Sequence, residues 1–456
     1  MKKLFLSLAL LLLGMLPTSC QNAPEADFAF TNVNIVDVEG GQILANQTVF
    51  IKEGKISLIV PSNEARLANT QTVRPGEGGY LMPGLAEMHA HIPGNQNMRL
   101  LEETLFLYLS NGITTIRGML GQPYHLELKE KVAAGEILGP RIYTSGPSLN
   151  GNSVTSVQQA EQMVRDQKKA GYDFMKLHPG LTLENFNAIA KTAKEVNMPF
   201  AGHVSIDVGI RNALKAQYAS IDHVDGYIEG LVPSSIRVNP NANGFFGLNF
   251  TKIADENLLD ELVQLTVENE VWIVPTQAMM ERWVGPEAPE TLAQETEMKY
   301  MSPSTVDNWV RTKKQIIESP AYDAEQALQF NTLRRKIIQK LHAAGVGILL
   351  GSDAPQVFNV PGFSIQRELD AMVRSGMSPL EAIRAGTLNP ALFFKAPHEF
   401  GAIKDGASAD LILVRKNPLD NIAHLQDRAG VMVRGKWLSR EEIDNRLKEI
   451  AKNYGH

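Results

Sequence analysis

The stretch Leu85-Ala86-Glu87-Met88-His89-Ala90-His91 is the most informative part of the sequence for predicting the fold. It is a short apolar run that follows Pro83-Gly84 and ends in two histidines, which is typical of a buried strand entered from a turn. Residues two apart in a strand point to the same side, so both imidazoles can face one metal ion at the strand's end. On its own this tripeptide pattern is weak support for a metal site. Its meaning depends on what the neighbouring strands carry.

The region around this stretch alternates short apolar segments with amphipathic helical segments, which is typical of parallel βαβ units. The helices have ordinary start signals. Ser378, for example, is a predicted N-cap that precedes Pro379 and has Glu381 at the third helical position. Eight repeats favour a closed (β/α)8 TIM barrel in an α/β protein. The eight predicted strands are residues 85–89, 113–117, 141–145, 173–177, 199–204, 220–224, 272–276 and 347–352.

Short β-type runs separated by turns lie on both sides of this region. Because they flank one long middle section, we expect them to pair into one small β-sandwich domain built from both chain ends. The expected division is a composite β-sandwich at residues 27–82 and 396–440, a barrel at 83–395 and a C-terminal helix or tail at 441–456.

Two connections, residues 225–270 and 277–345, are much longer than the others. Long connections after barrel strands lie on the active-site face, so we expect lids or specificity loops there.

The first twenty residues differ from the rest of the chain. Lys2 and Lys3 precede a long apolar run, which predicts a secretory signal peptide at residues 1–20. Cys20, the only cysteine, follows small residues and resembles the lipidated cysteine of bacterial lipoproteins, with residues 21–26 as a short tether. We therefore expect an exported protein, either periplasmic or membrane-anchored as a lipoprotein. A cleaved signal with an incidental cysteine is the alternative.

Composition narrows the range of partners. The chain of 456 residues is 44% hydrophobic and 21% charged with a net charge of −6, the balance of a soluble globular protein. No cluster of Lys and Arg stands out, so we expect no nucleic acid. A small-molecule substrate is the expected partner, and the membrane is met only through a lipid anchor at Cys20. Whether the chain forms a homo-oligomer stays open.

Four further metal-competent side chains fall at the ends of other predicted strands. Lys176 lies near the end of the fourth, His203 of the fifth and His223 of the sixth, and Asp353 follows the eighth. Parallel barrel strands deliver such side chains to one catalytic mouth. Each residue alone is equally well a hydrogen-bonded core group or a helix cap. Together with His89 and His91 they predict a metal site.

These residues and their flanking motifs resemble the amidohydrolase superfamily, in particular its imidazolonepropionase-like and prolidase-like branch. The resemblance spans nearly the whole chain after the predicted signal. It is carried by Pro83-Gly84-Leu85-Ala86-Glu87-Met88-His89-Ala90-His91, Gly112-Ile113-Thr114-Thr115-Ile116-Arg117, Phe174-Met175-Lys176-Leu177-His178, Gly202-His203, Asp222-His223, Gly351-Ser352-Asp353-Ala354, Ala385-Gly386-Thr387-Leu388-Asn389-Pro390-Ala391 and Gly406-Ala407-Ser408-Ala409-Asp410-Leu411-Ile412-Leu413-Val414.

The resemblance implies two divalent metal ions, with zinc the default for a histidine-rich site. His89, His91 and Asp353 would hold the more buried ion, and His203 and His223 the more exposed one.

Lys176 resembles the superfamily's carboxylated lysine, which bridges the two ions. A free ammonium cannot bind a cation, whereas a carbamate offers two oxygen donors. The resemblance then implies attack by a metal-bridging hydroxide on a C–N bond of an amide, such as a dipeptide or a cyclic amide. Asp353 would shuttle the proton to the leaving group. An uncarboxylated Lys176 with a single metal ion is the alternative.

Two more residues are candidates for contact with the substrate. His178 lies two residues beyond Lys176 and would point to the same side, although a plain loop histidine fits equally well. Arg117 ends the second predicted strand and could bind a substrate carboxylate bidentately. A structural ion pair with a neighbouring carboxylate is the favoured reading for Arg117.

Three other functions compete with amide hydrolysis. A lactone, ester or phosphotriester hydrolase could use the same two ions. A mononuclear deaminase would need a Glu shortly after the fifth-strand histidine, but His203 is followed by Val204-Ser205-Ile206-Asp207. A catalytically inactive surface binding lipoprotein predicts that at least one ligand is eroded, and all six are present.

Overall fold

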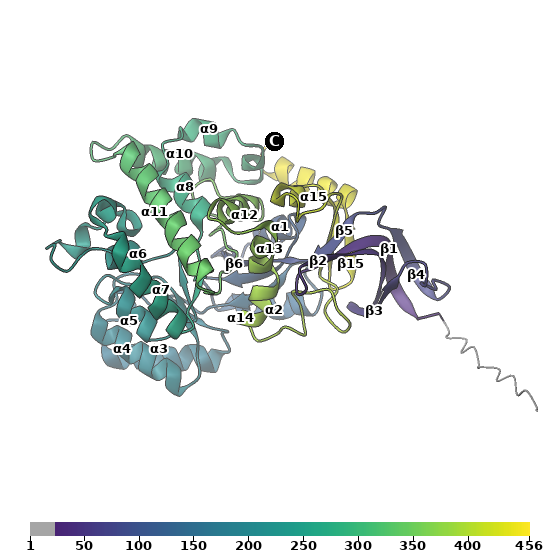
Figure 1. Cartoon of the computed structure of the whole chain (residues 1–456), viewed down its shortest axis with the longest axis horizontal. Coiled ribbons are helices and arrows are strands. Elements are labelled where there is room, and N and C mark those ends of the chain that lie inside the picture. The colour runs from purple at the N-terminus through teal and green to yellow at the C-terminus, as the bar shows by residue number, and fades with distance from the viewer. Residues whose placement is uncertain (1–22) are drawn as a thin grey trace, which may run out of the picture.

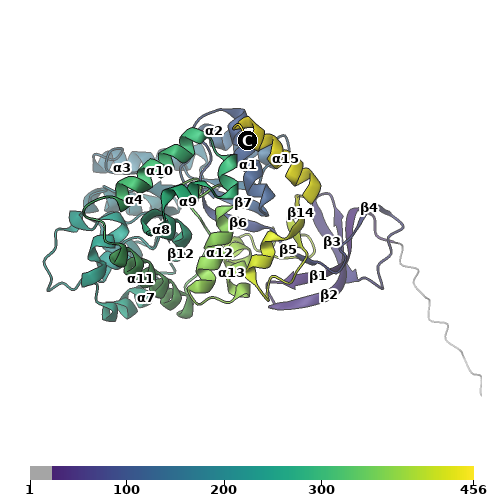
Figure 2. The ribbon, with the colours of Figure 1, turned by 90° about the horizontal axis from the view of Figure 1, so that it is seen from above.

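The computed structural model describes residues 23–456. The predicted signal peptide and Cys20 lie outside the described residues, and so does the start of the tether. Within the described part, a sheet region lies at one end of the molecule and a group of helices at the other, as two perpendicular views show (Figures 1 and 2). No helix among residues 23–456 has both the length and the apolar character needed to cross a bilayer.

One connected sheet of eight strands is built from both ends of the chain. Its order is β15-β14-β13-β5-β1-β2-β3, and β4 pairs in parallel with β1. The two chain ends meet where β5 pairs antiparallel with β13. That this sheet folds over into a sandwich, and where the domains divide, stay predictions. The strands are β1 (Ala26–Asp37), β2 (Gln42–Lys52), β3 (Lys55–Pro61), β4 (Thr70–Pro75), β5 (Tyr80–Pro83), β13 (Leu411–Val414), β14 (Arg428–Val433) and β15 (Lys436–Ser439).

Two parallel sheets contain seven of the eight strands expected in the middle of the chain. Their orders are β6-β7-β8 and β12-β11-β10-β9, so the fold is mixed α/β with parallel βαβ connections. Every residue of β6, β7, β9, β10 and β11 is buried, which explains their nearly continuous apolar sequences. The strands are β6 (Leu85–Ala90), β7 (Ile113–Gly118), β8 (Arg141–Thr144), β9 (Met175–Leu177), β10 (Phe200–Gly202), β11 (Ser220–Asp222) and β12 (Trp272–Val274).

The two parallel sheets are joined by isolated bridges on both sides. Between β8 and β9, Ser145 bridges to Phe174. Between β12 and β6, residues 347–354 bridge to Ile273 and to Ala90.

The eighth predicted strand, residues 347–352, is a correction to the sequence prediction because it does not form a regular strand. Its N–H groups are shared among different partners. The Leu350 N–H donates to the Ala385 carbonyl at 2.8 Å, and the Ser352 N–H donates to the Glu87 carboxylate at 2.7 Å. In a regular ladder every second donor, such as Leu350 and Ser352, would face the same neighbouring strand.

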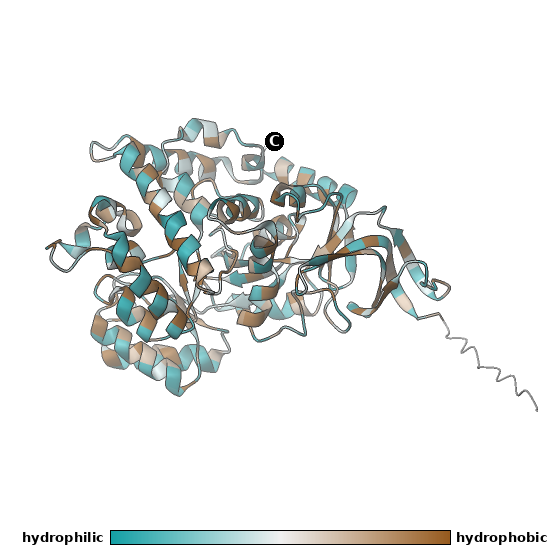
Figure 3. Ribbon diagram, in the orientation of Figure 1, coloured by the Kyte–Doolittle hydropathy of each residue, from teal (hydrophilic) through white to brown (hydrophobic). Residues whose placement is uncertain are grey.

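Helices surround the parallel sheets, and each carries both hydrophobic and hydrophilic residues along its length (Figure 3). The predicted capping box at Ser378 and Glu381 is confirmed. The α-helices are α1 (Met98–Ser110), α2 (Tyr124–Ala133), α3 (Val157–Ala170), α4 (Leu183–Glu195), α5 (Gly209–Lys215), α6 (Tyr227–Gly230), α7 (Leu259–Glu268), α8 (Gln277–Val284), α9 (Pro289–Ala293), α10 (Pro303–Ile317), α11 (Ala324–Ala343), α12 (Ser364–Arg374), α13 (Pro379–Gly386), α14 (Leu388–Phe393) and α15 (Arg440–Asn453).

Gly84 joins the terminal sheet to the first parallel strand. Its N–H donates to the Asp410 carbonyl at 2.8 Å, and a Cβ placed on it would lie 2.1 Å from Thr114 Oγ1. Any side chain would therefore push β6 away from β7. Glycine at this position lets the chain pass directly from β5 into the strand that carries His89.

Candidate metal centre

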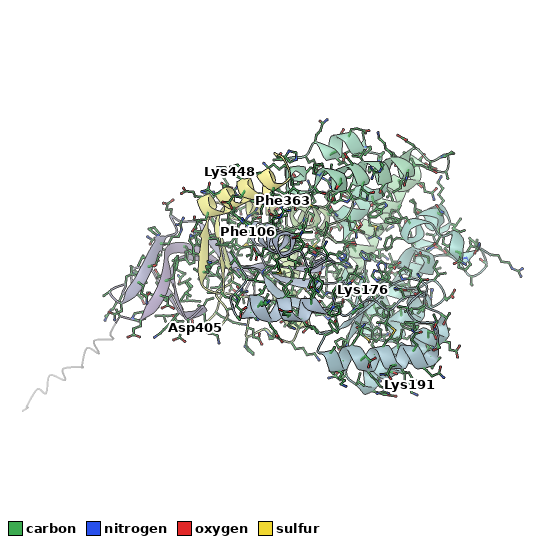
Figure 4. The ribbon with its side chains drawn as sticks, turned by 180° about the vertical axis from the view of Figure 1, so that it is seen from behind. Phe106, Lys176, Lys191, Phe363, Asp405 and Lys448 are labelled. Carbon is green, nitrogen blue, oxygen red and sulfur yellow. The ribbon has the colours of Figure 1, made fainter. Side chains whose placement is uncertain are left out.

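The strand ends bring the predicted metal ligands together in the interior. Lys176 lies on β9, His203 directly follows β10, and His223 directly follows β11. Figure 4 shows Lys176 within the body of the protein, whereas Lys191 lies on an outer helix. Parallel strands that end at one edge place their last side chains around a common space.

The tightest group is formed by His89, His223 and Asp353. Each offers a ligand atom, and these atoms lie within 4.8 Å of one another. Asp353 Oδ1 is 3.5 Å from His89 Nε2 and 2.7 Å from His91 Nε2. Asp353 Oδ2 is 3.7 Å from His223 Nδ1. One carboxylate thus faces three imidazoles, an arrangement suited to a shared cation.

The imidazole rings form a row in the order His89, His223, His203 and His178. The ring centroids of His203 and His223 are 4.6 Å apart, and those of His178 and His203 are 4.9 Å apart with nearly parallel rings. His203 Nδ1 is 3.1 Å from Asp225 Oδ2, which fixes the ring orientation. His178 therefore lies beside the predicted ligands rather than among the closest group.

Lys176 has no charge partner at hydrogen-bond distance although its side chain is fully buried. Its Nζ makes no hydrogen bond, and Asp222 Oδ2 is 3.7 Å away. Burial lowers the pKa of Lys176, with the charge of Asp222 acting in the opposite direction. A larger neutral fraction of the amine follows, and the neutral amine is the form that can react with carbon dioxide.

Asp222 was not among the residues predicted from the sequence. Its Oδ2 lies 3.1 Å from His89 Nδ1, and neither atom makes a hydrogen bond. Its Oδ1 accepts from Arg117 Nη2 at 3.0 Å. The sequence did contain a signal, because Asp222 and Asp225 flank His223 on both sides. Asp222 is placed to orient the ring of His89, and Asp225 that of His203, each through the Nδ1 atom of the imidazole.

Arg117 is directed into the protein rather than towards an open site. Its guanidinium donates to the Met88 carbonyl at 2.7 Å, to Ser220 Oγ at 3.0 Å and to Asp222. The side chain is completely buried. These contacts form the structural ion pair rather than a site for a substrate carboxylate.

Burial keeps the imidazoles neutral. It lowers the pKa of His203 to about 3 and that of His178 to about 2, and it holds the pKa values of His89 and His223 well below the usual range. The positive charge of Lys176 adds to the effect at His203. A neutral imidazole has the free lone pair that a metal ion requires.

Three residues at the mouth have left-handed backbone conformations that L side chains rarely adopt. The φ angles are 64° for His223, 47° for Thr276 and 60° for Asp353. Each costs on the order of 1–3 kcal/mol and persists only where surrounding contacts hold it. Thr276 Oγ1 lies 2.9 Å from His223 Nδ1, so two of these residues support one another. Such clustering of strain is typical of functional sites.

These side chains fit a divalent cation. Buried polar atoms normally have partners, yet Lys176 Nζ, His89 Nδ1 and Asp222 Oδ2 have none. The donors gathered here are imidazole nitrogens and carboxylate oxygens, the set that zinc and similar ions prefer. Bound cations would satisfy the imidazole nitrogens and the carboxylate of Asp353.

A cavity of about 350 Å³ opens beside His203. Its walls come from the segments after β9, β10 and β11 and from residues 241–246 of the first long connection. A small molecule in this cavity would contact His203, one of the predicted metal ligands.

Comparison with known proteins identifies the family. A profile of the amidohydrolase family matches residues 80–438. The chain therefore belongs to the amidohydrolase family, whose members generally use divalent metal ions, and it is a hydrolase that acts on carbon–nitrogen bonds. The resemblance inferred from the sequence motifs is confirmed.

Individual relatives agree with this assignment. The chain is 24% identical to ochratoxinase from Aspergillus niger, over 91% of this chain and 87% of that protein. Its fold is similar to that of bottromycin amidohydrolase, with a TM-score of 0.73 and 21% identity over 94% of this chain and 90% of the other. A Xaa-Pro dipeptidase is also similar, with a TM-score of 0.65 and 20% identity over 90% and 99% of the two chains.

Proposed function

We propose that the protein is a binuclear metal-dependent hydrolase that cleaves the C–N bond of an amide, such as a dipeptide or a cyclic amide. The observation that carries this proposal is the fully buried Lys176 Nζ, which has no hydrogen-bond partner and lies on the strand next to the imidazole row. An unmodified, protonated lysine there would be a buried charge without a hydrogen bond, and its nearest carboxylate, Asp222, already pairs with Arg117. A mononuclear site would give this lysine no role.

The proposal includes carboxylation of Lys176. The neutral amine adds to carbon dioxide, forming an N–C bond and releasing one proton, and the product is a carbamate with two oxygen donors. The lowered pKa of Lys176 favours the reacting form. His89, His91 and Asp353 would hold one ion, His203 and His223 the other, and the carbamate both.

Two bound divalent ions, zinc by default, would lower the pKa of a shared water and polarise the scissile carbonyl. The residues of the chain supply the remaining steps. Asp353 accepts the proton of the attacking water and returns it to the leaving nitrogen. The left-handed backbone at Asp353, whose N–H donates to the His89 carbonyl at 3.0 Å, holds the carboxylate in place for both transfers. Asp225 and Thr276 hold the rings of His203 and His223.

We further infer that the two parallel sheets form a closed (β/α)8 barrel. The bridges on both sides of each sheet support this arrangement, with residues 347–354 in the place of the eighth strand. Export is also part of the proposal, and it rests on the signal-like pattern of residues 1–20.

Metal content and peptide cleavage test the proposed function together. We expect the wild-type protein, purified with zinc and bicarbonate, to hold about two ions per chain and to release amino acids from a dipeptide library. Lys176→Ala should lose at least one ion and nearly all activity. Lys191→Ala, which changes an exposed lysine on α4, is the matched control and should behave as wild type.

Two results would overturn the proposal. Full metal occupancy and activity in Lys176→Ala would remove the bridging role. Turnover of lactones or phosphotriesters with no amide cleavage would assign the site to the competing class of hydrolases.

A further inference from the structure

The cavity beside His203 is rich in acidic side chains. Its lining includes the carboxylates of Asp207, Asp225 and Glu229, and none of the described residues that line it is a lysine or an arginine. Two of these carboxylates are accounted for. Asp207 is exposed to solvent. Asp225 accepts from the Val204 N–H and lies at hydrogen-bond distance from His203 Nδ1.

Glu229 has no ion-pair partner among the described residues. It lies on α6 (Tyr227–Gly230) and lines both the cavity beside His203 and a neighbouring cavity of about 340 Å³. Its Oε1 accepts from Asn243 Nδ2 at 2.6 Å, whereas its Oε2 is buried and has no partner. Leaving a buried carboxylate oxygen without a hydrogen-bond donor costs free energy of folding, so such an atom normally has a donor. A bound ligand can supply it.

The only cation that lines either cavity within the described residues is Arg211, and it is already paired. Its guanidinium donates to both carboxylate oxygens of Glu261, at 2.9 and 2.7 Å, and to the Gly230 carbonyl. Burial raises the pKa of Glu229 to about 7, and the charge of Asp225 acts in the same direction. The charge of the buried Arg334 also acts on Glu229, but its guanidinium donates to Gln277 and to the His223 and Pro275 carbonyls. Within the described residues, no cation therefore forms an ion pair with Glu229.

Two aromatic residues, Phe245 and Phe246, also line the cavity beside His203. The ring centroid of Phe246 lies 5.7 Å from that of His203 and 5.2 Å from that of His223. Phe246 has a φ of 50°, a rare conformation for a bulky residue, and Phe245 stacks on Trp283 at 4.9 Å. The face of an aromatic ring attracts a cation. Phe246 thus brings an apolar, cation-attracting surface next to the metal-ligand histidines.

We propose that this cavity selects substrates that carry a cationic group, an ammonium or a guanidinium, whose charge pairs with Glu229 while its apolar part packs against Phe246. This specificity rests on the proposed amide hydrolysis at the adjacent site. The cation can belong to a basic side chain or to the amino terminus of a peptide. Glu229 would be a specificity-determining residue, because it touches the substrate but takes no part in bond cleavage.

A binding experiment tests the cation site without relying on turnover. Butylguanidinium and butylammonium are titrated calorimetrically into the zinc-loaded protein, with butyramide as the neutral control. We expect the two cations to bind to the wild type and Glu229→Gln to weaken that binding about 10- to 100-fold. Glutamine keeps an oxygen for Asn243, so the fold should be retained. Asp207→Asn removes an exposed charge from the same cavity and should change binding less than about threefold.

Matched dipeptides identify the source of the cation. Leu-Lys is compared with the same peptide acetylated on its lysine side chain, and Leu-Met with N-formyl-Leu-Met. In the wild type, blocking either the lysine side chain or the amino terminus should lower kcat/KM by about 10- to 100-fold. In Glu229→Gln the blocked and unblocked peptides of that pair should have equal kcat/KM. The peptide pair that shows the loss names the source.

The outcomes separate this inference from the proposed function. Equal binding of butylguanidinium and butyramide, or equal effects of Glu229→Gln and Asp207→Asn, would overturn the cation site. Glu229-dependent binding of the cation without cleavage of any peptide would sustain the cation site and reject amide hydrolysis of these substrates.

Discussion

Replacing Arg117 by methionine should destabilise the protein more than loss of any exposed ion pair. Arg117 and Asp222 are both completely buried, and the guanidinium makes three hydrogen bonds. Methionine keeps much of the apolar stem but leaves the Asp222 carboxylate without its hydrogen-bonded cation. Breaking a buried pair by removing one partner costs about 3–5 kcal/mol in the free energy of unfolding. Lys176 Nζ, 3.7 Å from Asp222, offsets only part of this cost.

Thermal unfolding followed by circular dichroism measures the effect. At about 2.1 cal/mol/K per residue, unfolding a chain of 456 residues shifts the midpoint by roughly 1 °C per kcal/mol, so the midpoint of Arg117→Met should fall by roughly 3 to 5 °C. Arg165→Met is the matched control, because Arg165 pairs with Glu195 on the surface with both side chains nearly half exposed. Its cost should stay below about 1 kcal/mol.

A double substitution adds a second check. Combining Arg117→Met with Asp222→Asn removes both charges, so part of the lost stability should return. Equal midpoints for Arg117→Met and Arg165→Met would refute the view that this pair anchors the site.

Three further predictions concern individual contacts. Thr276→Val keeps the shape of the side chain but removes the contact with His223 Nδ1, so kcat/KM and zinc affinity should each fall about 10- to 100-fold; an unchanged zinc titration would argue against an orienting role. Ser378→Ala removes the N-cap of α13 and should lower the free energy of unfolding by about 1 kcal/mol in urea titrations, whereas a loss below a few tenths would contradict the capping box. Burial raises the pKa of Glu87 to about 8, so its contribution to stability is complete below its unfolded pKa of about 4.3 and is lost as pH rises towards 8. Glu87→Gln should therefore gain stability relative to wild type between pH 5 and pH 8, and a pH-independent difference in denaturation midpoint would oppose this.

The sequence predicted those features that depend on local periodicity. The alternation of apolar strands and amphipathic helices located β6 to β12, since buried parallel strands leave a strong pattern. The same periodicity placed His203 and His223 at strand ends, where the structure has them. The capping box at Ser378 was equally visible, because all of its contacts fall within four residues.

Features that depend on distant contacts were not visible in the sequence. The segment 347–352 has the composition of a strand, but its backbone donors are divided among β12, α13 and the Glu87 side chain, which only the tertiary arrangement brings near. The direction of Arg117 depends on Asp222, a hundred residues later in the chain. Glu229 belongs to no sequence motif. That one of its oxygens is buried without a partner while Asn243 binds the other can be seen only in the folded structure.

The pairing of β5 with β13 has a consequence for folding during synthesis. β5 runs through Gly84 into the strand that carries His89, yet its short antiparallel edge is completed only by β13, more than 320 residues later in the chain. A ribosome therefore releases nearly the whole catalytic region before this seam can form, and loop closure over such a separation is slow. Until then the first strand exposes an unpaired edge, and nascent chains would benefit from a chaperone that shields it.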